Sequence, residues 1–526
     1  MKENPDREKE ISCQGPSERE KKYDRQLRLW AADGQKALEQ ADILLINSGP
    51  GVVGVETLKN LVLPGIGKFT IIDSNQVSEA DLGSNFFLDE NCLGKSRAEC
   101  CVRFLKELNE DTQGEYHSTL DVPYLESLFT RRYFSFVLCT FPIQVEVLSV
   151  IKNYTHNSKI PLILIHSVGF YSYFKSILPE TIPIVNTHPE AEASRDLRLL
   201  NPWKELSEFT EVLTKDIEQM NDHKHSHIPY VALLLYFLTV WKKDHGRFPN
   251  SYTEKLEFKK IVAAGRRINL GSTEENFDEA VAAVMRNIKL STLSVATQKV
   301  FEYQPNEKEA KSNFWIITDA VKQFYKKHNL LPLPGSIPDM KAESSIYVQL
   351  QNIYKEKARK DATEILEIIL KHPLGKNIQL VEVENYCKNA AHIKLIHTYN
   401  EKANDLKLVA KTEFENDEIA VVTSQPLSLL PIYLALRATS HVPTLSPKSI
   451  VSSIESDIPR IGLNKRIQKV SQEVSRAKGG ELHNISSLTG GMVAQEVIKL
   501  ITRQYTPIDN TCIFDGITSR MQVLKL

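Results

Sequence analysis

The sequence predicts an α/β fold, in which a doubly wound sheet carries a large, mainly helical inserted domain. Three observations support this prediction. Short β-rich runs alternate with amphipathic stretches over 43–168, helices follow one another with few strands after about residue 180, and a helix and a strand return over 479–526. Because 526 residues exceed what one hydrophobic core usually serves, we expect two to four domains.

The first region has the pattern of repeated βαβ units. Since a crossover helix between two strands makes those strands parallel, the pattern predicts a mostly parallel sheet with helices on both faces. Five β-rich runs are the expected strands: "ILLIN", "KFTIID", "EYHSTL", "FSFVLCT" and "PLILIHSV". The helices expected between them cover 51–63, 94–109, 122–129 and 143–157.

The second region is expected to be helical, with two interruptions. Proline and glycine in 246–252 and 329–340 break the helical periodicity, and we expect the second of these segments to be an exposed loop. The predicted helices cover 204–219, 229–243, 254–264, 277–289, 312–327, 343–371 and 426–437. The predicted domains are a charged tail (1–20), the first part of the sheet domain (21–178), the helical insertion (179–478) and the closing part (479–526).

Composition excludes several classes of partner. With 65 basic and 66 acidic side chains the net charge is −1, so no bulk field attracts nucleic acid or an anionic membrane. The N-terminal stretch lacks the apolar run of a signal peptide, and no window approaches the roughly 20 apolar residues of a bilayer span. The seven cysteines show neither paired metal spacing nor a disulfide framework. We expect a soluble protein of the cytoplasm and nucleus.

A glycine-rich loop follows the first predicted strand. Gly49, Gly51 and Gly54 have the G-x-G-x-x-G spacing, and Asp73 ends the next predicted strand. Such a loop offers backbone amides and a helix N-terminus to a pyrophosphate, and the acid suits a ribose hydroxyl. The glycines are equally explained by a tight turn and close helix–sheet contact. Dinucleotide binding, other nucleotide binding and pure architecture therefore stay open, and an NAD-dependent oxidoreductase is the alternative function.

Five sequence blocks resemble the activating enzymes of ubiquitin and its relatives. They are "YDRQLRLW" (23–30), "LKNLVLPGIGKFTIID" (58–73), "DLGSNFFL" (81–88), "GKSRAE" (94–99) and "GGMVAQEVIKLIT" (490–502). The length, the helical insertion and "LPLPGSIPDMKAESSIYVQLQNIYKEKA" are similar to the regulatory subunits of the branch that serves neddylation. The resemblance implies a Rossmann-like, ThiF/MoeB-like adenylation domain and an inserted half-domain of the catalytic-cysteine type that lacks the cysteine.

The resemblance also implies that the ATP site of this chain is degenerate. Active members carry Arg in an Asn-Arg-Gln run, Lys before the Ala of the Gly-Lys block, and Asp after the fourth strand. Here Phe86 follows Asn85, Arg97 stands at the Lys position, and "CTFPIQ" has no Asp. Adenylation needs cations around the phosphates and a carboxylate for Mg²⁺. We therefore expect no cofactor or metal at Gly49, Gly51, Gly54, Asp73, Asn85 and Arg97, and ATP and magnesium in a partner subunit.

Arg25 matches an arginine that family members send into the partner's ATP site, where a guanidinium stabilises charge on the β- and γ-phosphates. The alternative is a surface arginine that pairs with Asp24 or packs near Trp30, in a chain that serves only as a scaffold. The implied function is that of a subunit without activity of its own, in an enzyme that adenylates the C-terminal glycine of a ubiquitin-like modifier. The implied partners are a cysteine-bearing subunit, the modifier and, through the complex, a conjugating enzyme.

Other motifs have structural explanations. Cys139 ends a strand that we expect to be buried, which favours a structural thiol over a nucleophile. No carboxylate or cysteine pattern completes a metal site around "HKHSH" (223–227). "KEKARK" (355–360) is expected on a solvated helix face, and the small residues of "GGMVA" (490–494) suit core packing or an interface. The resemblance implies a partner interface at His225, His227, Leu333, Pro334, Ile337, Pro338, Asp339 and Met340.

Overall fold

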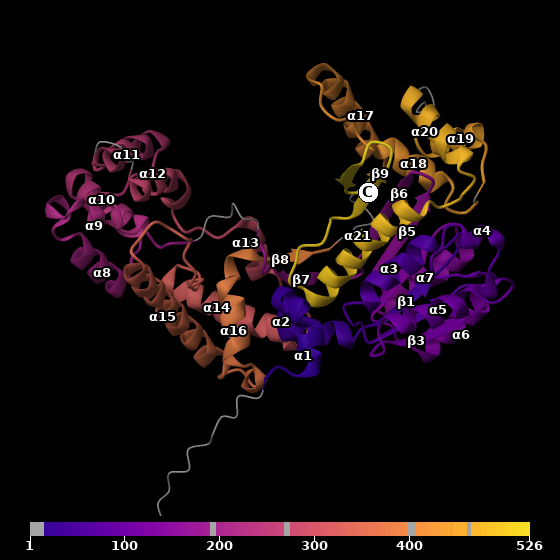
Figure 1. Cartoon of the computed structure of the whole chain (residues 1–526), viewed down its shortest axis with the longest axis horizontal. Coiled ribbons are helices and arrows are strands. Elements are labelled where there is room, and N and C mark those ends of the chain that lie inside the picture. Colours follow the sequence, from indigo (N-terminus) through magenta and orange to yellow (C-terminus); the bar gives the residue numbers. More distant parts are fainter. Residues whose placement is uncertain (1–14, 190–195, 268–273, 398–405, 443, 460–463) are drawn as a thin grey trace, which may run out of the picture. The chain divides into compact units, whose positions relative to one another are not determined.

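The computed structural model describes residues 15–189, 196–267, 274–397, 406–442, 444–459 and 464–526. The chain divides into two compact units (Figure 1). One comprises the residues up to Ile182 together with those from Ile396 onwards, and we call it the sheet unit. The other, Pro183–Leu395, is the helical unit. The predicted fold class, an α/β sheet with a large helical region, is confirmed.

An eight-stranded mixed sheet forms the core of the sheet unit, with strand order β10-β9-β6-β5-β4-β1-β2-β3. The five strands from β5 to β3 are parallel and correspond to the five predicted runs, whereas β6, β9 and β10 are antiparallel. The strands are β1 (Asp42–Ile46), β2 (Lys68–Ile72), β3 (Gln113–His117), β4 (Phe136–Thr140), β5 (Leu162–Val168), β6 (Tyr171–Ile177), β9 (Thr511–Asp515) and β10 (Arg520–Leu524).

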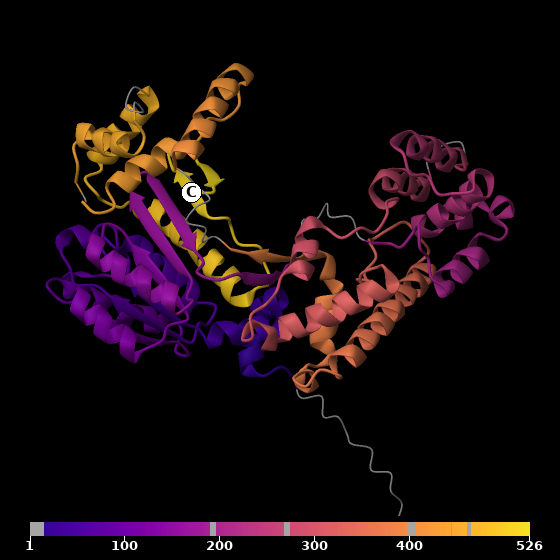
Figure 2. The same cartoon turned by 180° about the vertical axis from the view of Figure 1, so that it is seen from behind.

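Helices cover both faces of this sheet. On one face α21 contacts α3, and both views show the two helices side by side (Figures 1 and 2). A Cβ at Gly490 would lie 2.8 Å from the backbone nitrogen of Thr57, so this small residue is needed for close helix packing. The helices are α1 (Glu18–Lys22), α2 (Asp24–Glu39), α3 (Val52–Val62), α4 (Glu79–Leu82), α5 (Arg97–Leu108), α6 (Val122–Arg131), α7 (Val145–Asn157) and α21 (His483–Thr502).

Four more helices belong to the sheet unit although they precede residue 478. α18 is apolar along most of its length and packs on β6 and β9, so its burial joins this segment to the sheet. The helical unit therefore ends at Leu395, earlier than the predicted insertion of 179–478. The four helices are α17 (Leu406–Thr423), α18 (Leu430–Ala438), α19 (Pro447–Asp457) and α20 (Lys465–Arg476).

The helical unit contains two hydrophobic clusters that share the long helix α15. Leu350 and Tyr354 of α15 lie in one cluster and Ile365 and Ile369 in the other, while most of 355–360 is exposed, as predicted. The elements are β7 (Ile182–Val185), α8 (Lys204–Thr214), α9 (Asp222–His225), α10 (Tyr230–His245), α11 (Tyr252–Ala264), α12 (Glu275–Asn287), α13 (Val295–Glu302), α14 (Asn313–His328), α15 (Ser344–Ile369), α16 (Leu380–Lys388) and β8 (Ile393–Ile396). Among the helices described, none is long and apolar enough to cross a membrane.

Candidate functional site

The glycine loop joins β1 to α3 at the carboxyl edge of the parallel strands, where this type of sheet binds its ligands. Gly49 and Gly51 have φ of +63° and +70°, a region that favours glycine. A Cβ at Gly51 would lie 2.3 Å from Nδ2 of Asn47, and one at Gly54 would lie 2.4 Å from Oδ1 of Asn47. All three glycines are therefore explained by the turn and by the close approach of Asn47.

Asp73 follows β2 and is fully buried. Its Oδ2 accepts hydrogen bonds from Asn47 Nδ2 at 3.0 Å and from Arg97 Nε at 2.7 Å. Its Oδ1 accepts from the backbone nitrogen and Nδ2 of Asn75, both at 3.0 Å. A carboxylate has about four acceptor positions, and here four donors from the same unit occupy them. Asp73 is therefore held by its own chain rather than directed toward a ribose or a cation.

Arg97 connects the glycine loop to two carboxylates, and its side chain is only 3% exposed. Nη1 donates to Asp81 Oδ1 at 2.9 Å and to the carbonyl of Pro50 at 3.0 Å, and Nη2 donates to the carbonyl of Gly49 at 2.8 Å. Burial would lower the pKa of Arg97, but the charges and hydrogen bonds of Asp73 and Asp81 outweigh burial and raise it. Four of the five N–H donors of the guanidinium are thus bonded within the chain, and two of them fix carbonyls of the loop.

Glu481 brings a carboxylate to the first turn of α3. Its Oε2 accepts hydrogen bonds from the backbone nitrogen of Val53 at 2.8 Å and from Ser486 Oγ at 2.6 Å. A helix N-terminus of this kind is the place where related folds bind a phosphate. Burial raises the pKa of Glu481 to about 7, although both hydrogen bonds oppose that shift. Sequence reasoning missed this residue, because no spacing links it to a loop more than 400 positions earlier.

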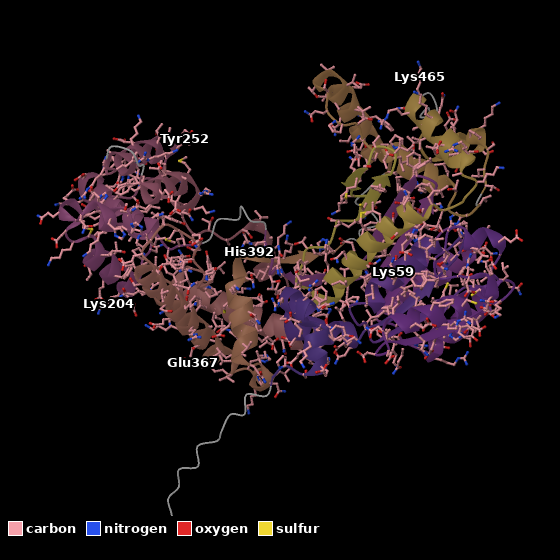
Figure 3. The ribbon with its side chains drawn as sticks, viewed as in Figure 1. Lys59, Lys204, Tyr252, Glu367, His392 and Lys465 are labelled. Carbon is pink, nitrogen blue, oxygen red and sulfur yellow. The ribbon has the colours of Figure 1, made fainter. Side chains whose placement is uncertain are left out.

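Two residues at the family's Asn-Arg-Gln position have different surroundings. Asn85 is buried, and its Oδ1 accepts from the backbone nitrogen of Phe87 at 3.0 Å. Phe86 is 74% exposed, and its ring stacks on His483 with centroids 3.7 Å apart. Glu56 on α3 pairs with His483 and with Lys59. Lys59 is labelled in Figure 3. Where active members have an arginine, this chain presents an apolar ring at the surface.

Arg25 lies on the first turn of α2 and is exposed. Asp24 pairs with Arg28 Nη2 at 2.9 Å instead, and within the described ranges Arg25 forms no ion pair. Trp30, the other neighbour considered from the sequence, donates its indole Nε1 to Gln35 Oε1 at 3.0 Å, and packing of Arg25 near its ring stays a prediction. Pairing with Asp24, one of the alternatives raised from the sequence, is thus not observed, and the guanidinium is available to another molecule.

Among the described residues, every thiol is buried and no histidine belongs to a group that could hold a metal ion. Every cysteine in the described part of the chain is buried, and burial raises the pKa of Cys139 to about 12, as expected for a structural thiol. His225 Nδ1 lies 2.7 Å from Glu274 Oε1, and its ring stacks on Phe277 with centroids 5.0 Å apart. Over the residues that the structure covers, no three His, Cys, Asp or Glu side chains are grouped to hold a metal ion.

The predicted partner interface needs a correction. Leu333, Ile337 and Met340 are buried within the helical unit, because the loop after α14 folds these apolar side chains onto the unit's own core. His225, on α9, is buried by its contacts with Glu274 and Phe277. These four therefore present no surface to a partner. His227, Pro334 and Pro338 are partly exposed and Asp339 is exposed. Contact of those four residues with a partner stays a prediction.

The parallel strands and the glycine loop define a Rossmann-like α/β protein, and side chains of the same chain bond to that loop. The chain belongs to the ThiF family, whose model matches residues 23–526. Within it, the chain belongs to the NEDD8-activating enzyme E1 regulatory subunits, as predicted from the sequence blocks. It is 34% identical to that subunit of Xenopus laevis, over 97% of this chain and 99% of the relative.

Other relatives carry the same description. The regulatory subunit AXR1 of Arabidopsis thaliana is 32% identical, with 96% of each chain covered. The regulatory subunit of Saccharomyces cerevisiae is 26% identical, over 96% of this chain and all of the relative. Among solved structures, a crystal structure of PaaA matches 34% of this chain and 56% of its own, with 17% identity and a TM-score of 0.28. That score is too low to support a conclusion from the structural likeness.

Proposed function

We propose that this chain is the non-catalytic subunit of a heterodimeric NEDD8-activating enzyme, in which a partner subunit holds ATP, magnesium and the acceptor cysteine. Family membership supports the assignment to this pathway. One observation supports the proposal that this chain has no ATP site of its own. Arg97 bonds to Asp73, Asp81 and two carbonyls of the glycine loop.

The free energies involved favour the loop in its present, internally bonded form over a loop that binds a nucleotide. Removing one partner from a buried ion pair costs about 3–5 kcal/mol, because the remaining charge is left without compensation. Binding ATP with a Kd of about 1 mM would supply about 4 kcal/mol. A nucleotide that had to displace Arg97 and free Asp73 would therefore gain little or nothing, and it would also meet the carboxylate of Glu481 at the helix N-terminus.

The buried thiols support the same division of labour. A thioester-forming cysteine must be exposed, and its pKa must allow a thiolate near neutral pH. In the part of the chain that the structure describes, all cysteines are buried; Cys13 lies outside the described residues. The modifier is therefore proposed to pass from its adenylate to a cysteine of the partner.

We further propose that Arg25 acts in trans on the partner's ATP. An arginine fork binds phosphate oxygens with directed, charge-assisted hydrogen bonds. Arg25 is exposed, and the start of its helix is anchored by the buried Tyr23, whose hydroxyl donates to Asp111 at 3.2 Å. The exposed apolar residues Phe86, Leu482 and Leu488 are the surface that we propose the partner's adenylation domain covers.

Modifier-dependent pyrophosphate exchange tests the first part. The purified chain alone should show no exchange, and addition of the partner subunit should restore it. Robust exchange by the chain alone would refute the proposal. An NAD-dependent oxidoreductase would instead show stoichiometric binding of the dinucleotide in calorimetry, which the filled loop does not predict.

Arginine variants of the reconstituted pair test the second part. Arg25→Ala should lower the adenylation rate by about 10²–10³, by analogy with the loss of other donors that stabilise transition-state charge. Arg28→Ala is the matched control, because Arg28 lies on the same helix and forms only an exposed pair with Asp24, which is worth little. Equal rates for the two variants would leave a scaffold role only.

A further inference from the structure

The sheet unit holds a cavity of about 540 Å³ that the proposed function does not use. Alternate residues of β6 face opposite sides of the sheet. Ser172 Oγ lies 2.6 Å from Thr489 Oγ1 of α21, so Tyr173 and Lys175 face away from α21. The cavity is on that opposite side, lined by β6, α7, α18 and α19. It therefore lies across the sheet from the packed pair of α3 and α21.

Three cations line this cavity: Lys175 of β6, Lys152 of α7 and Arg437 of α18. The one acidic side chain in the lining is Asp457, which pairs with Arg437 Nη1 at 3.2 Å. His441 is also part of the lining, and its Nδ1 lies 2.8 Å from the carbonyl of Ile143. With the α-carboxylate of Leu526, which also lines the cavity, three cations face two carboxylates.

Lys175 is the most buried member of this group, and no carboxylate compensates its positive charge within the described residues. It is largely buried in the middle of a strand, and in the described ranges no acid pairs with it. Burial is the main cause that lowers the pKa of Lys175 to about 8, and the charges of Lys152 and Arg437 lower it further. A buried cation among like charges destabilises the folded chain, and such arrangements concentrate at functional sites.

Apolar and aromatic side chains form much of the remaining lining, together with the hydroxyls of Ser440 and Ser453. Phe141, Leu148 and Leu164 line the cavity, together with Tyr173 and Tyr433, whose rings pack edge to face at 4.9 Å. Leu526 is also in the lining, and its backbone oxygen accepts from Asn510 Nδ2 at 2.7 Å. The volume is in the range of sites for small molecules.

We propose that this cavity binds a small organic phosphate, with the phosphoryl group between Lys175, Lys152 and Arg437 and the apolar body against the aromatic walls. A phosphate monoester carries nearly two negative charges at neutral pH, which the three cations of the lining attract. Arginine and lysine are the side chains that recognise phosphate, through a fork of donors and a point charge respectively. The lining includes none of the loop glycines Gly49, Gly51 and Gly54.

Calorimetric titration of the full chain with phenyl phosphate, at constant ionic strength, tests the proposal. We expect one saturable site, with affinity at least tenfold lower in Lys175→Met and in Lys152→Met. Lys106→Met is the matched control, since Lys106 is exposed on α5 and should leave binding unchanged. Lys152 is itself exposed, so its variant keeps the test valid if Lys175→Met does not fold.

Two results would overturn the proposal. One is the absence of saturable binding by the unmodified chain, or equal affinity in the two cavity variants and the control. The other is binding of phenol as tight as that of phenyl phosphate, because the phosphoryl group would then contribute nothing. Protection of Lys175 from an amine-specific reagent by phenyl phosphate, measured by peptide mass spectrometry, would locate the ligand; unchanged labelling at saturation would place it elsewhere.

Discussion

Two cation sites in the sheet unit differ in how their charges are compensated. Arg97 is buried at the glycine loop and bonds to two carboxylates and two carbonyls of its own chain. Lys175 is largely buried in the cavity beside β6, and within the described residues it has no acidic partner. The comparison teaches that a buried cation alone does not define a binding site. What matters is whether the chain's own acceptors already satisfy it.

The largest expected effect is at the satisfied site. Arg97→Met leaves Asp73 and Asp81 buried without their cation, which should lower the free energy of unfolding by about 3–5 kcal/mol. Urea unfolding measures this loss. The control Lys106→Met, exposed on the same helix, should change stability by less than about 0.5 kcal/mol. A loss at Arg97 as small as that of the control would mean that the network is not what closes the loop.

The variant Glu481→Gln tests the glycine-loop site through the pH dependence of its stability. The folded state raises the pKa of Glu481 from 4.5 to about 7, so its contribution to stability is fully present below pH 4.5 and is lost as pH rises through 7. Relative to Glu481→Gln, the unmodified chain should therefore lose roughly 3 kcal/mol between those limits. Thermal or urea unfolding of both proteins from pH 4.5 to pH 8 measures the difference. Parallel stability curves would contradict the raised pKa.

Substitution of Lys175 should change the free energy of unfolding by less than substitution of Arg97, and in the opposite direction. Lys175→Met removes a cation without a partner and should stabilise the chain by about 1–3 kcal/mol at pH 7, after allowance for partial exposure. Because the folded state lowers the pKa of Lys175 from 10.5 to about 8, the penalty is present below pH 8 and disappears as pH rises to 10.5. Urea unfolding at pH 7 and pH 10 tests this, and destabilisation at pH 7 would show that Lys175 has a compensating partner.

Local sequence signals predicted much of the fold. Short β-rich runs that alternate with amphipathic stretches identified the five parallel strands, and helical periodicity identified α10, α14 and α15. β6 and β10 were missed, because β6 follows β5 after a short turn and β10 is a half-exposed edge strand.

The candidate site was less predictable, because its decisive contacts join distant parts of the chain. Arg97 was identified only as a replacement for lysine, and nothing in the sequence showed that it would bond to the carbonyls of Gly49 and Pro50. The prediction that the proline-rich loop is exposed was wrong at Leu333. This residue is buried, and its backbone nitrogen donates to the buried Asp361 at 3.0 Å. Proline and glycine predict irregular backbone, but they do not predict exposure.

The most direct test of the central claim is calorimetric titration of ATP and Mg²⁺ into the purified Lys175→Met chain, where the cavity beside β6 makes little contribution. If the side chains of Arg97, Asp73 and Glu481 close the glycine loop, no saturable binding will be observed up to millimolar ATP. Stoichiometric binding that is abolished by Asp73→Asn would contradict this account, because it would show that the loop still receives a nucleotide.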